Sequence, residues 1–339
     1  MQAFAVGVDL GATNLRIAAI DAAGRKLDSI ETRTQPDRTA VIEKMTSAIR
    51  ALAIQYERNY SFLGVGVGVP GVIDLARGTV HSASNLPEWN DYPLAQDLEV
   101  RLGVPVLLEN DANCAALGEN WIGAGKGIDD LCMLTLGTGV GGGLLMNGRP
   151  WHGVAGMAGE VGHMTVLPDG RACGCGNHGC LEQYASASAI RRLAAEAIGR
   201  GEPTELAQIE DPKRELTAEA VFQAAMREDR VAKQVFEIAG TALGIALANL
   251  INILNLPLYV LGGGLAQAWK VFSPSLFHEL KKRSIVFRTR ERLEPATHST
   301  RICPTQLGGD AGLIGAARMP MADRFTESHC RPAVRENVG

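Results

Sequence analysis

The stretch 4-FAVGVDLGATNLRIAAI-20 predicts a strand, a tight glycine turn and a second strand in which apolar residues recur at every second position. In the turn, Gly11–Asn14, backbone N–H groups and the Thr13 hydroxyl can point at a phosphate. Asp9, at the end of the first strand, could hold a magnesium ion directly or through water. An ordinary hairpin with a polar turn fits the same residues, so this stretch alone leaves both interpretations open.

A second stretch, 131-LCMLTLGTGVGGGLLM-146, repeats the pattern and suggests an internal duplication, with two unrelated hairpins as the alternative. Its clustered glycines each weaken a strand by about 0.5–1 kcal/mol, which indicates that a ligand approaches the backbone closely. The P-loop pattern of Walker-type ATPases is absent. Gly137, Gly139 and Gly142 have the spacing of a dinucleotide fingerprint, but that fingerprint needs a helix where residues 143–146 predict a strand.

Strands and helices are expected to alternate along the rest of the chain, which predicts an α/β protein. Further strands are expected at 62–69, 104–108 and 258–261. Helices are expected at 39–58, 93–102, 112–121, 186–198, 217–227 and 230–254. Polar or glycine-rich clusters follow several of the strands, and open α/β sheets bind ligands at such strand ends.

Length and composition narrow the class of protein. The 339 residues suggest two domains, and a hydrophobic content of 46% is enough for a sizeable core. A net charge of −4 argues against a nucleic-acid or anionic-membrane surface. No secretory signal is expected at the N-terminus. Residues 241–260 are apolar but interrupted by asparagines, so they predict a buried helix followed by a strand rather than a membrane span.

A short glycine-rich segment collects metal-binding side chains. His163, Cys173, Cys175 and Cys180 supply one imidazole and three thiolates, which is a complete tetrahedral set for zinc. Because no coordination position stays open, such a zinc would be structural rather than catalytic. Buried free cysteines or a redox pair are the alternatives.

A set of carboxylates and amides lies close to these loops and suits a polyhydroxylated ligand: Asn85, Asn110, Asp111, Glu160, His163 and Glu182. Asp111 follows a buried strand and precedes a helix, so its carboxylate could accept a proton from a substrate hydroxyl. The alternative interpretation of Asp111 is a helix N-cap, which would only satisfy backbone N–H groups.

Taken together, these residues resemble the ROK family of sugar kinases, and most closely the bacterial glucokinases of that family. The resemblance covers residues 4–320 and rests on ordered blocks at 9–14, 68–71, 84–89, 108–114, 134–143, 158–165, 173–182 and 260–265. The family has the two-lobed α/β fold of actin, hexokinase and the Hsp70 chaperones, which is ribonuclease H-like. The resemblance therefore implies ATP and sugar in a cleft between two lobes, together with a structural zinc loop.

The resemblance also implies a role for each block. The phosphates of ATP, with Mg²⁺, are expected at Asp9, Gly11, Thr13, Asn14, Gly137, Thr138 and Gly139, and the adenosine near Gly262, Gly263 and Gly264. The sugar is expected to contact Gly71, Ser84, Asn85, Asn110, Asp111, Glu160, His163 and Glu182. Asp111 matches the family's catalytic base. His163 would give one ring nitrogen to zinc and the other to a sugar hydroxyl.

The implied activity is that of an ATP-dependent hexose kinase, with conversion of D-glucose to D-glucose 6-phosphate as the first expectation. Kinases of the same family that act on N-acetylmannosamine, N-acetylglucosamine, allose, fructose or a β-glucoside are the alternatives. A sugar-responsive transcription regulator is a further alternative. It would need a helix-turn-helix domain ahead of the strand that begins near Phe4, where no residues remain for one.

The expected domain boundaries follow from the same resemblance. A small lobe is expected at 1–111, joined by a helix at about 308–320, and a large lobe at 112–307, with the zinc loop at 163–180. The polar tail, 321–339, is expected to be disordered or loosely attached. A cytoplasmic homodimer is expected, with small-molecule partners only and no nucleic acid or membrane.

Overall fold

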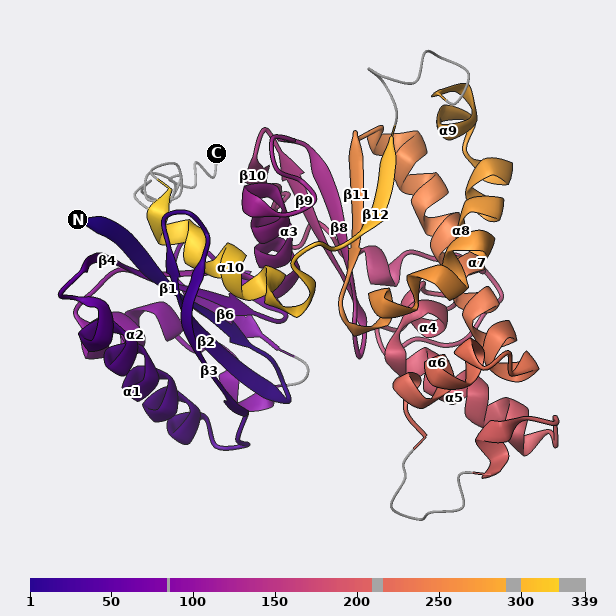
Figure 1. Cartoon of the computed structure of the whole chain (residues 1–339), viewed down its shortest axis with the longest axis horizontal. Coiled ribbons are helices and arrows are strands. Elements are labelled where there is room, and N and C mark those ends of the chain that lie inside the picture. The colour runs from indigo at the N-terminus through magenta and orange to yellow at the C-terminus, as the bar shows by residue number, and fades with distance from the viewer. Residues whose placement is uncertain (84–85, 209–215, 291–299, 323–339) are drawn as a thin grey trace, which may run out of the picture. The chain divides into compact units, whose positions relative to one another are not determined.

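The computed structural model describes residues 1–83, 86–208, 216–290 and 300–322 (Figure 1). The expected sugar contacts Ser84 and Asn85 lie outside the described residues, as does the expected tail from residue 323 on. The chain forms two compact units. The first unit contains Met1–Asp129, Gly143–Ala158 and the chain from Asp310 on, and the second contains Asp130–Gly142 and Gly159–Gly309.

The first unit is built on a five-stranded sheet of order β3-β2-β1-β4-β7. Its strands are β1 (Gln2–Leu10), β2 (Asn14–Asp21), β3 (Lys26–Arg33), β4 (Tyr60–Val69) and β7 (Val106–Asn110). β1 pairs antiparallel with β2 and parallel with β4, so the opening hairpin predicted from the sequence is confirmed. The carboxyl ends of β1 and β7 carry Asp9 and Asn110, which places the polar residues where the sequence predicted them.

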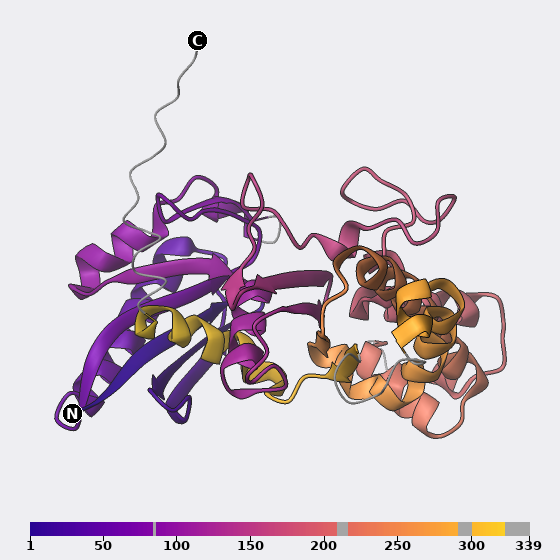
Figure 2. The ribbon, with the colours of Figure 1, turned by 90° about the horizontal axis from the view of Figure 1, so that it is seen from above.

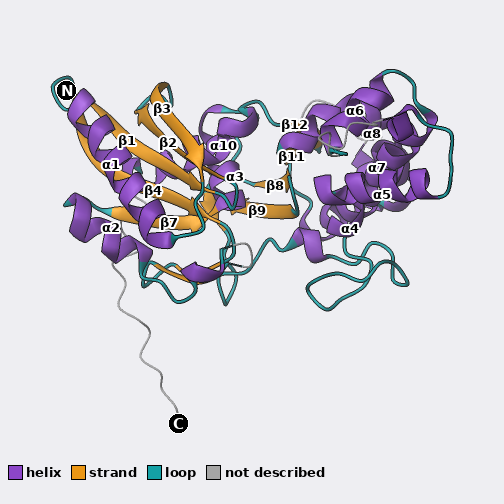
Figure 3. Cartoon of the chain, turned by 90° about the horizontal axis from the view of Figure 1, so that it is seen from below, coloured by secondary structure: helices purple, strands orange, loops and turns teal. Residues whose placement is uncertain are grey.

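One face of this sheet forms the main core of the first unit. Side chains of alternate β1 residues, Phe4, Val6 and Val8, pack with apolar residues of α1 (Arg38–Tyr56) and α2 (Leu94–Leu102). Figure 3 shows both helices along the sheet. A small antiparallel pair, β5 (Val72–Asp74) and β6 (Thr79–Ser82), follows β4.

The other face of the sheet is covered by α10 (Ala311–Arg318), which also packs against α3 (Asp111–Ile122). Figure 2 shows α10, in yellow, running beside the first strands. Glycines make this close approach possible: a Cβ at Gly7 would lie 2.1 Å from the Leu313 carbonyl oxygen, and one at Gly66 would lie 1.9 Å from that of Ala316. Since α3 and α10 pack together, residues 112–129 belong to the first unit, whereas the sequence analysis placed them in the second lobe.

A second five-stranded sheet has the order β10-β9-β8-β11-β12. Its strands are β8 (Leu131–Leu136), β9 (Val140–Met146), β10 (Arg149–Pro150), β11 (Leu258–Gly262) and β12 (Arg301–Pro304). Both sheets have the same topology. If the five strands of each sheet are numbered along the chain, their order across the sheet is 3-2-1-4-5. This shared order favours the internal duplication over two unrelated hairpins. Because β9 continues as a strand, the dinucleotide-fingerprint alternative is wrong.

The second unit carries most of the helices, and Figure 3 shows them gathered in it. They are α4 (Glu182–Ala185), α5 (Ala187–Gly199), α6 (Ala218–Met226), α7 (Arg230–Leu254), α8 (Trp269–Arg283) and α9 (Ile285–Arg290). Among the described residues, α7 alone is long and apolar enough to cross a membrane, a test that core helices also pass. Its buried residues and the following β11 confirm the predicted buried helix and strand.

Candidate functional site

The first polar turn lies at the end of β1 in the first unit. The N–H of Gly11 donates to the Asn14 carbonyl oxygen at 2.9 Å, and the Thr34 hydroxyl donates to the Gly11 carbonyl oxygen at 2.7 Å. These bonds fix the turn from within and leave Thr13 and Asn14 exposed to solvent. The turn is therefore rigid and open, as a phosphate-binding loop needs to be.

Asp9 has a partner that the sequence analysis missed. Arg16, directly opposite Asp9 in the β1–β2 register, donates a hydrogen bond to the Asp9 carboxylate. A guanidinium nitrogen of Arg16 also lies 4.0 Å from a carboxylate oxygen of Asp310. The signal was present in the sequence, because a hairpin that turns at Gly11–Asn14 pairs position 9 with position 16.

Asp111 occupies the first turn of α3, immediately after β7. The N-cap of this helix is Asn110, whose side-chain oxygen accepts hydrogen bonds from the N–H groups of Ala112 at 2.9 Å and Asn113 at 3.3 Å. Asn110 rather than Asp111 is therefore the N-cap, although Asp111 Oδ1 also accepts from the Ala112 N–H at 2.8 Å.

Asp9 and Asp111 come together within the first unit. A Cβ at Gly312 would lie 3.8 Å from the Asp111 carbonyl oxygen and 3.9 Å from a carboxylate oxygen of Asp9. The pKa of the Cys114 thiol rises well above its usual value because of burial, and next because of the charges of Glu109, Asp9 and Asp111. The carboxylates of Glu109, Asp9 and Asp111 thus lie near enough to the buried Cys114 thiol to disfavour its thiolate.

Gly71, the remaining expected sugar contact of the first unit, has a backbone that only glycine adopts easily. Its φ is +94°, and a Cβ there would lie 2.2 Å from the Ser82 carbonyl oxygen. Gly71 therefore lies against the end of β6, just before the segment that carries Ser84 and Asn85.

The glycine turn of the second unit binds a carboxylate of its own chain. The N–H of Val140 donates to Glu182 Oε2 at 2.9 Å, and a Cβ at Gly139 would lie 2.3 Å from the same oxygen. Glu182 was expected as a sugar ligand, and these contacts place one of its oxygens on the turn. A Cβ at Gly137 would meet nothing within 4 Å, so the turn is open to a ligand at that point.

The other glycines of this stretch have a different explanation from the one expected. A Cβ at Gly142 would lie 2.3 Å from the Gly159 carbonyl oxygen, and one at Gly143 would lie 2.5 Å from that of Ala112. These glycines therefore admit neighbouring segments of the chain itself. For these two positions, the expectation that the missing side chains make room for a ligand is not what the structure shows.

A pocket of about 240 Å³ opens beside the same turn. The pocket is lined by Gly137 and Thr138 of the turn, by Gly264, and by Phe222 of α6. Glu219 and Gln267 contribute polar side chains to the lining. Gly263 allows the approach of the two turns, since its φ is +81° and a Cβ there would lie 2.4 Å from the Leu136 carbonyl oxygen. The two turns were expected at one nucleotide site. Nothing in the sequence indicated Glu219 and Phe222 of α6, or Gln267 just after Gly264, as further lining residues.

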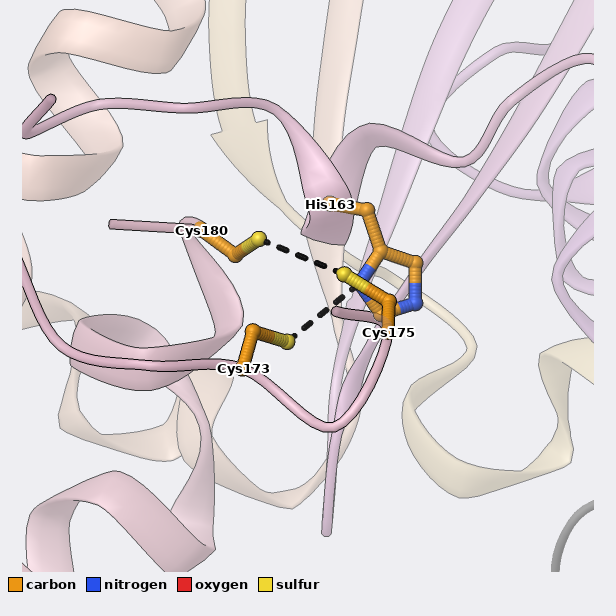
Figure 4. A group of neighbouring side chains, drawn as sticks. All are labelled: His163, Cys173, Cys175 and Cys180. Atoms are coloured by element: carbon orange, nitrogen blue, oxygen red, sulfur yellow. Dashed lines mark hydrogen bonds between the residues drawn. The ribbon is translucent and has the colours of Figure 1, made fainter. Parts of the chain in front are cut away.

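The zinc-binding prediction meets a matching geometry in the second unit. One ligand atom from each of His163, Cys173, Cys175 and Cys180 can be chosen so that all four lie within 4.8 Å of one another (Figure 4). The Cys173 sulfur lies 3.7 Å from His163 Nδ1, and the Cys175 sulfur lies 3.7 Å from that of Cys180. Ligand atoms of a tetrahedral zinc site with Zn–S bonds of about 2.3 Å are about 3.8 Å apart.

The thiols of this cluster influence one another. Burial acts to raise the pKa of Cys173, but hydrogen bonds from Cys175, His163 and Cys180 lower it to about 7. Burial, and then Cys175 and Cys173 through hydrogen bonds and charge, raise the pKa of Cys180 to about 12. Three thiolates so close together need a cation, and the donor set of three sulfurs and one imidazole fits zinc.

Two amides and an arginine support the cluster from outside. Gln183 Nε2 donates to the Cys173 sulfur at 3.6 Å, and Asn177 Nδ2 donates to the Cys180 sulfur at 3.5 Å. Arg192 holds the Gln183 side chain through its oxygen at 3.0 Å. With Nδ1 of His163 turned to the sulfurs, Nε2 lies 3.9 Å from a carboxylate oxygen of Glu160. The two expected sugar ligands Glu160 and His163 are thus neighbours.

The comparisons with known proteins agree with this arrangement. The profile of the ROK family matches residues 5–322. The chain is 39% identical over 314 residues to a glucokinase of Halalkalibacterium halodurans, covering 91% of this chain and 92% of that one, and 35% identical to a glucokinase of Thermotoga maritima, covering 92% and 95%. A Streptomyces griseus ROK glucokinase, solved with glucose and AMPPNP, is 33% identical at a TM-score of 0.75, covering 93% of this chain and 98% of that one.

Proposed function

Because the chain belongs to the ROK family, with its actin/hexokinase-like fold, we propose that it is an ATP-dependent glucokinase, which transfers the γ-phosphoryl group of ATP to glucose. The observation that carries this proposal is that Gly312 lies beside both Asp9 and Asp111, next to a polar turn that is exposed to solvent. A cation site next to a carboxylate base is what phosphoryl transfer to a hydroxyl requires.

In the proposed reaction, Asp111 accepts the proton of a glucose hydroxyl while that oxygen forms a bond to the γ-phosphorus and the bond to the β-phosphate oxygen breaks. Asn110, Glu160, His163 and Gly71 bind the sugar, with Ser84, Asn85 and Glu182 as further ligands. The product is glucose 6-phosphate, which makes glycolysis the pathway that we propose it serves.

ATP is proposed to bind along the two polar turns. Gly11, Thr13 and Asn14 of the first turn, with Gly137, Thr138 and Gly139 of the second, would donate hydrogen bonds to its phosphates. The pocket lined by Phe222 and Gly264 would take the base, with Gly262 and Gly263 near the ribose. Asp9, oriented by Arg16, would hold Mg²⁺, which neutralises charge on the transferring phosphoryl group when bound.

Zinc is proposed as a structural ion held by His163, Cys173, Cys175 and Cys180. By holding Nδ1, it would aim Nε2 of His163, with Glu160 next to it, at sugar hydroxyls. We further propose a cytoplasmic homodimer whose other partners are small molecules.

The test is an ADP-release assay with ATP, Mg²⁺ and a panel of sugars. Glucose is expected to be preferred at least tenfold in kcat/KM over mannose, N-acetylmannosamine, N-acetylglucosamine, allose and fructose. A preference for another sugar of the panel would make the chain a different ROK kinase. ADP release that no sugar stimulates would overturn the kinase proposal.

A further inference from the structure

Glu109, which precedes Asn110 and Asp111, is a buried carboxylate whose two oxygens contact different parts of the chain. It is 3% exposed at the end of β7. Its Oε1 accepts hydrogen bonds from the Asn110 N–H at 2.9 Å and from Asn113 Nδ2 at 3.0 Å. This oxygen therefore holds the backbone at the start of α3 together with a side chain of the first helical turn.

The other oxygen of Glu109 points to a distant part of the chain. Oε2 lies 2.8 Å from Nε2 of His152, which follows β10. This contact joins the start of α3 to residues 152–158, because the His152 carbonyl oxygen accepts from the Ala158 N–H at 3.1 Å. The chain continues directly from Ala158 through Gly159 to Glu160.

The charges explain why this contact matters. A buried carboxylate without a partner costs several kcal/mol or takes up a proton, and Asp9 and Asp111 lie near Glu109 around Cys114. Arg16 pairs with Asp9, so His152 is the group that balances Glu109. Burial acts to lower the pKa of His152, but the hydrogen bond and the charge of Glu109 raise it, which favours the imidazolium form.

We propose that His152 is a positioning residue for phosphoryl transfer, which acts through Glu109 to fix the orientation of Asn110 and Asp111. The inference rests on the proposed kinase function and adds a residue to it. The contact of the His152 side chain is with the Glu109 carboxylate. Its effect passes through the two oxygens of one carboxylate, and its main chain fixes the segment that ends before Glu160.

The test compares His152→Ala, which removes the donor, with His152→Gln, which keeps an N–H donor but no charge. In His152→Ala, kcat/KM for glucose is expected to fall tenfold to about a hundredfold, since misplacement of a catalytic group by about 1 Å has that effect. Both kcat and the KM for glucose should change, whereas the KM for ATP should not. His152→Gln should recover part of the loss, because it keeps the hydrogen bond to Glu109 but not the charge.

Asp21→Asn is the matched control for a merely structural role. Asp21 is 1% exposed in the same unit and is hydrogen bonded to Arg25 Nε at 2.7 Å, but it lies at the far end of β2 from Asn14. This variant should lose stability and keep wild-type kinetics. The double variant Glu109→Gln/His152→Ala should be little worse than His152→Ala alone, because a neutral amide at position 109 needs no cation.

The outcomes separate this inference from the proposed function. If the wild-type chain phosphorylates glucose and His152→Ala has wild-type kcat and KM, the positioning role is overturned and the kinase remains. Loss of thermal stability in His152→Ala with unchanged kinetics, as in Asp21→Asn, also overturns it. A wild-type chain inactive on every sugar overturns both.

Discussion

Asp111, the proposed base, is not the N-cap of the helix that carries it. Asn110 caps α3 and keeps its bonds from Ala112 and Asn113 when Asp111 is replaced. The Ala112 N–H also donates to Asp111 Oδ1 at 2.8 Å, and asparagine keeps that acceptor. In Asp111→Asn, turnover is expected to fall by about 10²–10⁴-fold, the usual contribution of a general base. Glucose binding, measured by calorimetry, should stay within a few-fold of wild type.

The measurement is ADP release at saturating glucose and ATP, with the circular dichroism spectrum as the check that the variant folds. Turnover near that of wild type would remove Asp111 from the role of base. A fold that collapses on this conservative change would instead show that the carboxylate is needed for structure.

Cys175 tests the zinc proposal at the same scale. It is the exposed member of the cluster, so Cys175→Ser removes one ligand with little change in core packing. The variant is expected to lose zinc, measured by elemental analysis, and to bind glucose more weakly because Nδ1 of His163 is no longer held. Cys303→Ser, outside the cluster, should keep both. Metal-free wild-type protein with normal kinetics would contradict the proposal.

Single residues were predictable where their partners are near in sequence. The four candidate zinc ligands fall within a short segment, and their residue types alone suggest their chemistry. Glu109 and His152 could not be paired from the sequence, because nothing in the spacing of two residues so far apart indicates contact. Arg16 lies between these cases, since the hairpin register that pairs it with Asp9 could have been worked out from the turn.

At the scale of elements, α10 depends on glycines that let backbones touch. A Cβ at Gly315 would lie 1.7 Å from the Cys114 carbonyl oxygen on α3, and one at Gly118 would lie 2.2 Å from that of Ala311. Gly315→Ala must therefore push the two helices apart. We expect a loss of about 1–3 kcal/mol in the free energy of unfolding, the usual cost of overpacking.

The loss is measured by urea denaturation. Gly199→Ala is the control, because Gly199 is also helical but a Cβ there would meet nothing within 4 Å. That substitution should be neutral or slightly stabilising, since alanine favours helices more than glycine does. Equal stability of the two variants would show that α3 and α10 can separate without cost.

The elements themselves followed well from the sequence, because apolar periodicity reports which faces are buried. The predicted helices at 39–58 and 230–254 correspond to α1 (Arg38–Tyr56) and α7 (Arg230–Leu254). The structural role of individual glycines was harder to predict from the sequence. At Gly142 and Gly143 the sequence predicted close approach of a ligand. The atoms that approach these two glycines are instead carbonyl oxygens of the chain itself, which only the tertiary structure reveals.

At the scale of the whole molecule, each unit contains a carboxylate that accepts several hydrogen bonds, Asp21 in the first and Asp229 in the second. Burial acts to raise the pKa of Asp21 in the first unit, but bonds from Arg25 and Ala23 lower it below its usual value. Burial likewise acts to raise the pKa of Asp229, the N-cap of α7, but bonds from Ala232, Glu205 and Thr204 lower it. Each carboxylate thus binds protons less readily in the folded chain than in the unfolded one.

The pH dependence of stability follows from this difference. A carboxylate with a lowered pKa in the folded state stabilises the fold above its unfolded pKa, which is about 3.9 for aspartate. That contribution is lost as the pH falls through the folded-state pKa. The melting temperature should therefore decrease on acidification below about pH 4, and less steeply in Asp21→Asn. An identical slope in this variant would contradict the assignment.

The repeated strand order could be suspected from the sequence, because two glycine turns follow similar apolar runs. The division into units could not be placed, since it depends on where α3 and α10 pack. The chain passes from one unit to the other after Asp129, Gly142, Ala158 and Gly309. Boundaries were expected after residues 111 and 307; Gly309 lies close to the second, whereas Asp129 lies beyond the first because α3 belongs to the first unit.

The packing of α10 on the first sheet also has a consequence for folding during translation. β1 is made first, yet the helix that covers it, Ala311–Arg318, is among the last elements to be made. Until that helix has been synthesised, the sheet face that contains Gly7 and Gly66 stays exposed through nearly the whole of translation. The first unit is therefore the part of the nascent chain that most needs a chaperone, because its synthesis begins first and is completed last.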